Sequence, residues 1–366
     1  MRSGVLESEV PGLYNGLSKK GGERMTSSEA NDPEPEAARP PGYPAIASPY
    51  KWGLFGVLVV AALLRLHGLA VPGLWYAEAN NLYLTRFVDL HGSLLDPRNM
   101  SDLPVMAVVT WFWQGCIRAI TLLDPVSPAS DFLTRLQPFC FSMLTVWMAF
   151  HAGRVVTKDN GAALAAAFLC AISPFQVYYG QELSVLSLHG FLALLLVYCL
   201  VRALDEDHAR HWAGLAACEA LLLYTHFASL ELLLFVNLFF VLCLWPYRRH
   251  ILKWMITQAV AWGLAAPALI LHVRARRDML RIEIPWYDFK PGWETGLITF
   301  KNFFAGYTPT LWSYAVLFFL AAALCVVGLY ALRRRTPMIV LLLLIVAVAG
   351  LVDTWVDFRK LAKKSG

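Results

Sequence analysis

The sequence predicts an all-α membrane protein, a polytopic bundle of about nine transmembrane helices with an in-plane amphipathic helix in its first outer loop. Hydrophobic residues make up 58% of the 366 positions and charged residues only 16%, whereas soluble domains average about 45–50% and about 25%. The mean hydropathy is +0.52. Apolar windows of about 20 residues, the length that crosses a bilayer core of about 30 Å, recur along the chain. This composition excludes a soluble globular enzyme.

The elements follow in order from the hydropathy. Residues 1–48 are polar and rich in Pro, Glu, Ser and Gly, which predicts a disordered cytoplasmic tail. Residues 52–352 form the predicted membrane domain, and residues 353–366 form a short basic tail. The apolar windows of the membrane domain lie at 52–70, 104–123, 132–156, 161–179, 185–203, 212–228, 229–247, 254–272, 312–332 and 337–352.

Basic residues in the short loops predict the orientation. Arg and Lys cluster at 154–158, 202–210, 248–253 and 333–335. The positive-inside rule places such loops in the cytoplasm. They share that side with the N-terminal tail only if one early window does not cross the membrane. The prediction is therefore an integral, multi-pass protein of the inner or plasma membrane, with a cytoplasmic N-terminus.

The window at 104–123 is the one predicted not to cross. Its polar residues form one stripe on an otherwise apolar helix, at Thr110, Gln114, Arg118 and Thr121. Such a helix lies in the interface plane, with Trp111 and Trp113 at headgroup depth. The alternative is a tenth span with a buried Arg118.

This topology predicts long outer loops at 71–131 and 273–311 and short outer turns near 178–184 and 225–229. Long loops between membrane helices commonly carry function. The formal net charge of +5 comes from basic residues at span ends, so nucleic acid is not a predicted partner, whereas membrane lipid is. The seven cysteines lie in apolar runs without metal-ligand spacing, which indicates small buried side chains rather than disulfides or a zinc site.

A few ionisable residues stand out against the apolar background. Glu78 follows the aromatic pair Trp75-Tyr76 at the mouth of the first helix. Carboxylates at a membrane surface act as general bases or ligate hard cations. Glu219 lies in the middle of an apolar window, where an ionisable group has a functional or structural role that the sequence does not assign. Arg65 and His67 are expected to snorkel to the interface.

The second long loop contains an arginine cluster on the side where the positive-inside rule does not expect one. Guanidinium groups bind phosphate oxygens with two parallel hydrogen bonds. The alternative is simple contact with anionic headgroups. The predicted phosphate-binding residues are Arg274, Arg276, Arg277 and Arg281.

Several motifs in sequence order carry a family resemblance. They are LWYAEANN at 74–81, Asp102-Leu103-Pro104, SPFQVYYGQELSVLSL from Ser173 to Leu188, and YTHF from Tyr224 to Phe227. Together they resemble the GT-C membrane glycosyltransferases, in the branch similar to protein mannosyltransferases and bacterial lipid A aminoarabinose transferases. The resemblance covers roughly residues 52–250.

The resemblance implies transfer of a sugar from a polyprenyl-phosphate donor to the hydroxyl of a glycan, lipid or protein acceptor on the periplasmic or lumenal face. It implies that Glu78 and Asp102 are catalytic, with Glu78 as the base or as the ligand of a divalent cation such as Mg²⁺ or Mn²⁺. The arginine cluster fits the donor phosphate, which it would stabilise as it leaves. The residues implied to line the sugar pocket are Arg135, Tyr179, Gln181, Glu182 and His226.

The chain also departs from the family pattern. Ala77 replaces the Asp of the family's Asp-Glu pair, and Ser184 and Leu186 stand where Arg and Tyr are usual. General-base catalysis contributes typically about 10²–10⁴-fold, so loss of the base matters. The alternative function is therefore a catalytically degenerate protein that binds lipid-linked sugar or partners an active enzyme. A third is a lipid or sugar transporter.

Overall fold

The computed structural model describes residues 45–69, 78, 79, 82, 104–121, 128–226, 229–243 and 247–279, and single positions at 323, 326, 330 and 337. Every regular element in these ranges is helical, which confirms the all-α class for this part of the chain. The N-terminal and C-terminal tails, the windows at 312–332 and 337–352 as spans, and most of both long loops lie outside the described residues.

The helices begin close to where the hydropathy windows begin. They are α1 (Ser48–Leu66), α4 (Pro104–Thr121), α5 (Pro128–Thr157), α6 (Asn160–Ile172), α7 (Pro174–Gln181), α8 (Leu186–Glu206), α9 (Ala209–Leu223), α10 (Ser229–Leu242), the 3₁₀ turn η2 (Arg248–His250) and α12 (Ile251–Met279). α12 continues past 272 into the predicted second outer loop, so the backbone of Arg274, Arg276 and Arg277 is helical.

Several helices identify a membrane-embedded protein. α1, residues Asp131–Thr157 of α5, and α8 are long and apolar enough to cross a bilayer. α6 and α7 reach that length together, but they are bent by 56° at Ser173-Pro174. α9 and α10, at 15 and 14 residues, are shorter than a typical span. The total of about nine spans stays a prediction.

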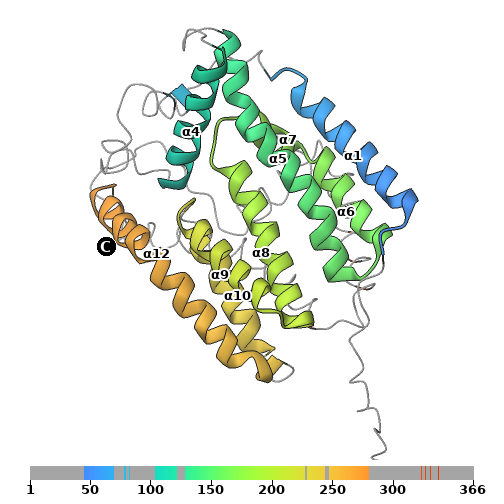
Figure 1. Cartoon of the computed structure of the whole chain (residues 1–366), viewed down its shortest axis with the longest axis vertical. Helices are drawn as coiled ribbons and strands as arrows, with labels where there is room; N and C mark the ends of the chain where they lie inside the picture. Colours follow the sequence, from blue (N-terminus) through green and yellow to red (C-terminus); the bar gives the residue numbers. More distant parts are fainter. Residues whose placement is uncertain are drawn as a thin grey trace, which may run out of the picture. The chain divides into compact units, whose positions relative to one another are not determined.

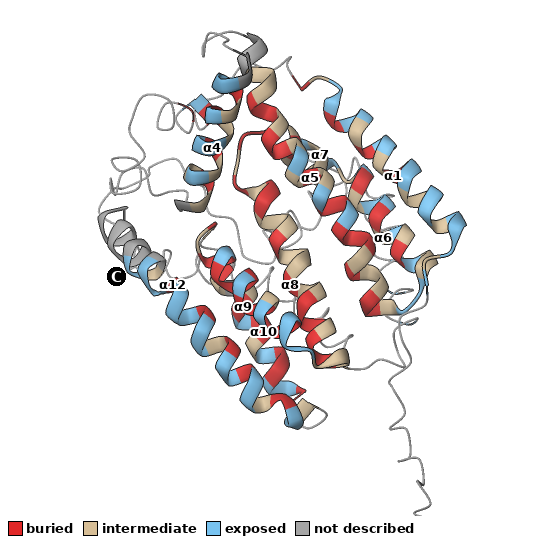
Figure 2. Cartoon of the chain, viewed as in Figure 1, coloured by how far each residue is buried: buried red, intermediate tan, exposed pale blue. Residues whose placement is uncertain are grey.

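α5 and α8 pack against each other at the centre of the described helices (Figure 1). α1, α6 and α7 pack against α5, whereas α9 packs on α8 and also contacts α10 and α12. Ala163, Ala167 and Ala171 place small side chains along one face of α6, against α1 and α5. A second core joins α8, α9, α10 and the start of α12. Figure 2 shows the buried positions on the facing sides of these helices and exposed positions on their outer sides.

The loops predicted to lie on opposite sides of the membrane gather at opposite ends of the helices. The connections at 158–159, 207–208 and 247–250 form what we call the basic end, where Lys158 pairs with Asp205 at 3.6 Å and Lys253 with Asp207 at 2.7 Å. The segments 67–69, 182–185 and 224–226, with the first turns of α5, form what we call the polar end. The alternation of helix direction along the chain thus follows the predicted order.

Arg65 does not snorkel, and that prediction is wrong. Its side chain is fully buried and donates to Ser142 Oγ at 2.6 Å, and to the carbonyl oxygens of Ala171 at 2.9 Å and Cys170 at 3.4 Å. The last carbonyls of a helix have no partner within it, and Pro174 has no N–H to offer. The guanidinium therefore satisfies the carbonyl groups that the bend between α6 and α7 exposes.

Candidate functional site

A buried ion pair organises the polar end. Arg135, in the second turn of α5, donates from Nη2 to Glu78 Oε2 at 2.8 Å and from Nε to Glu78 Oε1 at 3.3 Å. The two side chains are only 4% and 2% exposed. Glu78 Oε1 also accepts from the backbone N–H of Leu183 at 2.8 Å, and Arg135 donates to the carbonyl of Leu69 at 3.0 Å. The pair therefore joins the first loop, α5 and the α7–α8 turn.

The bend between α6 and α7 positions the next predicted pocket residues. Gln181 ends α7 and donates to the carbonyls of Arg65 at 3.0 Å and His67 at 2.8 Å, so it ties α7 to the end of α1. Glu182 follows as the buried C-cap of α7. The Tyr179 ring packs edge-on against Phe175 and Tyr178. Hydrogen bonds to backbone carbonyls fix the side chain of Gln181, and contacts between rings fix that of Tyr179.

The polar stripe of α4 faces protein. Gln114 donates to Thr134 Oγ1 at 2.7 Å, and Thr110 Oγ1 accepts from Gln137 at 3.1 Å. Thr110 and Gln114 are both buried. The polar stripe predicted from the sequence therefore faces α5 at Thr110 and Gln114. Two polar side chains on α5, one turn apart, provide a better partner than solvent. Trp111, next to Thr110 in sequence, is 48% exposed.

His226 lies beside a second histidine that sequence reasoning missed. His189, in the first turn of α8, packs against it edge-on with ring centroids 5.9 Å apart. Ser229 Oγ donates to the carbonyl of Leu222 at 2.6 Å, so at 3.3 Å it accepts a hydrogen bond from His189 Nδ1. A neutral imidazole carries one N–H, so this contact leaves Nε2 of His189 with its lone pair. No described residue bonds to Nε2.

Three of the predicted phosphate ligands are on the last turns of α12. Tyr224 Oη, at the polar end, donates to the carbonyl of Leu264 at 3.0 Å. Leu264 is therefore the part of α12 that lies beside the polar end. Arg274 is ten residues further on, about 15 Å along the helix axis at 1.5 Å per residue. The side chains of Arg274, Arg276 and Arg277 are not described. Arg281, Asp102 and Ala77 lie outside the described residues altogether.

Glu78 is predicted as a possible metal ligand, and hydrogen bonds compete with that role. Both of its oxygens accept hydrogen bonds, from Arg135 and from Leu183. A cation at Glu78 would have to displace a guanidinium that is bound through two atoms. Within the described ranges, no three His, Cys, Asp or Glu side chains lie close enough together to hold a metal ion.

The basic end contains a further polar cluster that the sequence did not reveal. Asp207 ends α8 in the left-handed conformation, with φ 55°, and accepts from Trp212 Nε1 at 3.1 Å and Lys253 Nζ at 2.7 Å. Burial raises the pKa of Asp207, but hydrogen bonds from Lys253 and Trp212 and the nearby cations outweigh burial and lower it overall. The cluster fastens α8, α9 and α12 together.

His250 completes this cluster. Arg249 Nε donates to His250 Nε2 at 2.8 Å, so His250 donates from Nδ1 to Asp207 Oδ1 at 3.1 Å. Burial lowers the pKa of His250, the Asp207 carboxylate opposes this effect, and the cation of Arg249 adds to it. These two hydrogen bonds fix the imidazole in one tautomer.

Two of these networks left weak signals in the sequence. Ser173-Pro174 inside a single hydropathy window indicates a bend, and Arg65 inside another window indicates a charge that needs partners. The sequence does not show that Arg65 binds the carbonyl groups at this bend, because the two segments are more than a hundred residues apart in the chain.

No protein-family model matches the chain, and a search of curated proteins finds no significant match.

Proposed function

We propose that this chain is a membrane glycosyltransferase that moves a sugar from a polyprenyl phosphate to an acceptor hydroxyl at the outer face of the membrane. The observation that supports it is the gathering of polar groups at one end of an apolar bundle. Five residues are predicted from the sequence to line the pocket. Arg135, Glu182 and His226 lie in the segments that form the polar end, and Tyr179 and Gln181 lie in the last turn of α7, next to it. The loops rich in Lys and Arg lie at the opposite end.

The same arrangement supports the proposed topology, with about nine spans and a cytoplasmic N-terminus. The basic end faces the cytoplasm in this proposal, in accord with the positive-inside rule. α4 lies in the interface plane at the outer face. Arg118, in the last turn of α4, is exposed.

His189, rather than Glu78, is the general base in this proposal. Glu78 is held by Arg135 and by the N–H of Leu183, whereas His189 presents an unprotonated Nε2 in a fixed orientation. In the proposed reaction the acceptor oxygen attacks the anomeric carbon of the sugar, and its proton passes to His189 Nε2. The bond between that carbon and the phosphate oxygen breaks, and the polyprenyl phosphate leaves with the electron pair. Glu78 positions the α7–α8 turn.

The experiment measures polyprenyl phosphate released from radiolabelled polyprenyl-phosphate sugars by full-length protein in nanodiscs. We expect H189Q to lower the rate by about 10²–10⁴-fold, the usual contribution of a general base, while donor binding is retained. H208Q, at an exposed histidine of the basic end, is the matched control and keeps the wild-type rate. Equal rates for H189Q and the wild type would remove His189 from the mechanism.

A second function is favoured by one observation. The Glu78 carboxylate is the acid expected from the family motif, and it already accepts hydrogen bonds from Arg135 and Leu183, which disfavours a role as a base. The second candidate is therefore a protein that binds lipid-linked sugar without cleaving it. Saturable donor binding with no release from any donor would support binding and reject transfer.

A further inference from the structure

Glu219 is a buried carboxyl that neither proposed function uses. It lies in the middle of α9 with no solvent exposure. Its only described hydrogen bonds come from one amide nitrogen, Gln258 Nε2 on α12, at 2.9 Å from each carboxyl oxygen. A carboxylate has about four acceptor positions, so a single NH₂ group leaves part of them without a partner.

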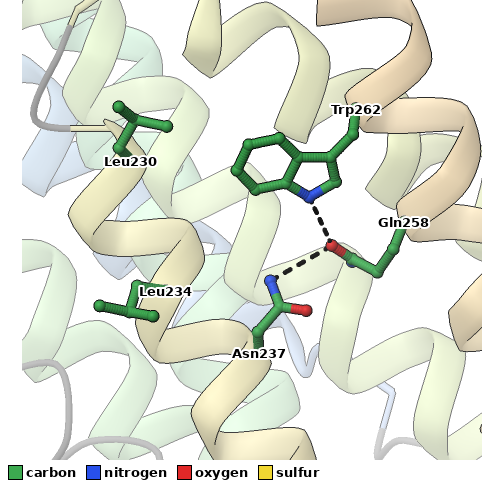
Figure 3. Close-up of a pocket in the computed structure, with 5 residues that line it drawn as sticks. All are labelled: Leu230, Leu234, Asn237, Gln258 and Trp262. Carbon is green, nitrogen blue, oxygen red and sulfur yellow. Dashed lines mark hydrogen bonds between the residues drawn. The ribbon is translucent and has the colours of Figure 1, made fainter.

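The orientation of Gln258 is fixed by its other partners. Trp262 Nε1 and Asn237 Nδ2 both point at Gln258 Oε1, each at 3.2 Å (Figure 3). An indole nitrogen only donates, so the amide oxygen of Gln258 faces Trp262 and its NH₂ group faces Glu219. The Gln258 NH₂ group thus faces the Glu219 carboxyl on α9, and the Gln258 carbonyl oxygen links α12 to α10.

No cation balances Glu219 in the described part of the chain. None of the ion pairs there includes it, and Lys253 on α12 is engaged with Asp207 at the basic end. The titratable groups beside it are the thiols of Cys218 on α9 and Cys199 on α8. α10 contributes the neutral Asn237, and the side chain of Glu231 on α10 is not described. A buried carboxyl without a counter-ion takes up a proton, because burying the bare charge costs far more.

A groove leads from the surface of the bundle to this network. Its volume is about 390 Å³, and its walls are Leu230, Leu234, Asn237, Gln258 and Trp262. Figure 3 shows the two leucines on the same helix as Asn237, and Gln258 and Trp262 on the neighbouring helix. Leu234 is 59% exposed on a face of α10 that is apolar, as expected for contact with lipid. Gln258 lines the groove and bonds to Glu219, so it connects the carboxyl to the groove.

We propose that Glu219 is a proton-binding site within the membrane, a neutral carboxyl reached from the lipid through the groove between α10 and α12. The ligand of this site is a proton, and Gln258, Asn237 and Trp262 hold the carboxyl in place. The site is independent of sugar transfer at the polar end.

The test uses a hydrophobic carbodiimide on the full chain in nanodiscs, with peptide mass spectrometry as the readout. Such a reagent reacts with a protonated carboxyl. The carboxyl oxygen bonds to the central carbon of the reagent, the proton goes to one of its nitrogens, and nothing is released. We expect label on Glu219 near neutral pH, less label as the pH rises and the carboxyl deprotonates, and none at that position in E219Q.

Two controls test whether the reagent reaches Glu219 through the groove rather than from water. L234W narrows the groove and lowers the labelling of Glu219, whereas L252W, on an exposed part of α12 outside the groove lining, leaves it unchanged. A water-soluble carbodiimide does not label Glu219, because the carboxyl has no solvent exposure. Label on Glu219 from the water-soluble reagent alone would overturn access from the lipid.

A second measurement does not depend on reagent access. Infrared difference spectra of the wild type against E219Q should contain the carbonyl stretch of a protonated carboxyl at neutral pH. A carboxylate band in its place would show that Glu219 is ionised and would overturn the proposal. If E219Q does not fold, the loss of the same protonated band during alkaline titration of the wild type provides the test.

Discussion

The Glu78–Arg135 pair shows how one buried contact determines the local structure of the polar end. Each side chain is almost fully excluded from solvent, so neither charge has water to replace its partner. A buried pair of this kind adds little over a well-packed apolar pair, but removing one member leaves an uncompensated charge. Its main consequence here is positional, because Glu78 also binds the N–H of Leu183.

We therefore expect strong coupling between the two side chains. Glu78→Gln and Arg135→Met should each cost about 3–5 kcal/mol of stability, and the double variant should cost clearly less than the sum. Thermal or denaturant unfolding of the four proteins in detergent completes the cycle. Additive effects would show that the pair is not coupled.

His250 makes the stability of the basic end depend on pH. Burial lowers its pKa from 6.5, so the folded protein binds this proton less readily than the unfolded chain does. The contribution of neutral His250 to the free energy of unfolding is complete above pH 6.5. It is lost as the pH falls from 6.5 through the lowered pKa of His250 in the folded protein. We expect the thermal midpoint to fall on acidification in this range and His250→Asn to flatten the profile. His208→Asn, at an exposed position, should leave the acid limb intact.

At the scale of the elements, the hydropathy pattern predicted where helices run but not how their polar faces pair. The windows at 132–156 and 185–203 correspond closely to α5 and α8 because a long apolar run has few alternatives to a helix. The sequence shows the polar stripe on α4, but not which neighbour the stripe packs against. It packs on α5 because Thr134 and Gln137, one turn apart, provide its hydrogen-bond partners. Such pairing between distant segments does not follow from periodicity within one helix.

The bend at Pro174 brings α7 close to α5, and Gly180 permits this contact. A Cβ atom at Gly180 would lie 2.7 Å from Ser142 Oγ and 2.9 Å from Ser142 Cβ. We expect Gly180→Ala to destabilise the protein by about 1–3 kcal/mol, the usual cost of overpacking. Gly56→Ala in α1 is the matched control, because nothing lies within 4 Å of its added Cβ. It should be neutral or stabilise by up to about 1 kcal/mol, and thermal unfolding compares the two.

At the scale of the whole molecule, the alternation of loops between two ends could be predicted from charge alone. The short loops at 158–159 and 207–208 lie next to lysines and arginines, whereas the turns at 182–185 and 224–226 contain none. In the structure the first two loops lie at the basic end and the other two at the polar end. The site was less predictable. Glu78 and Arg135 were both named from the sequence, but their contact with each other was not, since nothing local connects residues that are 57 positions apart.

The proposed topology predicts which ends are accessible from outside the cell. In a version without the seven native cysteines, Ser184→Cys should react with a membrane-impermeant maleimide in intact cells. His208→Cys should react only after permeabilisation. Labelling of both from the same side would require a different number of crossings between 184 and 208.

The buried position of Arg65 has a consequence for biosynthesis. The ribosome makes α1 first, but the carbonyl of Ala171 that receives the guanidinium is 106 residues later in the chain. At about 5–20 residues per second, that interval lasts on the order of 5–20 s. During this time Arg65 has only the carbonyl of Ala61 from its own helix as an acceptor. Arg65 therefore gains its acceptors on α5 and α6 only after both of those helices have been synthesised.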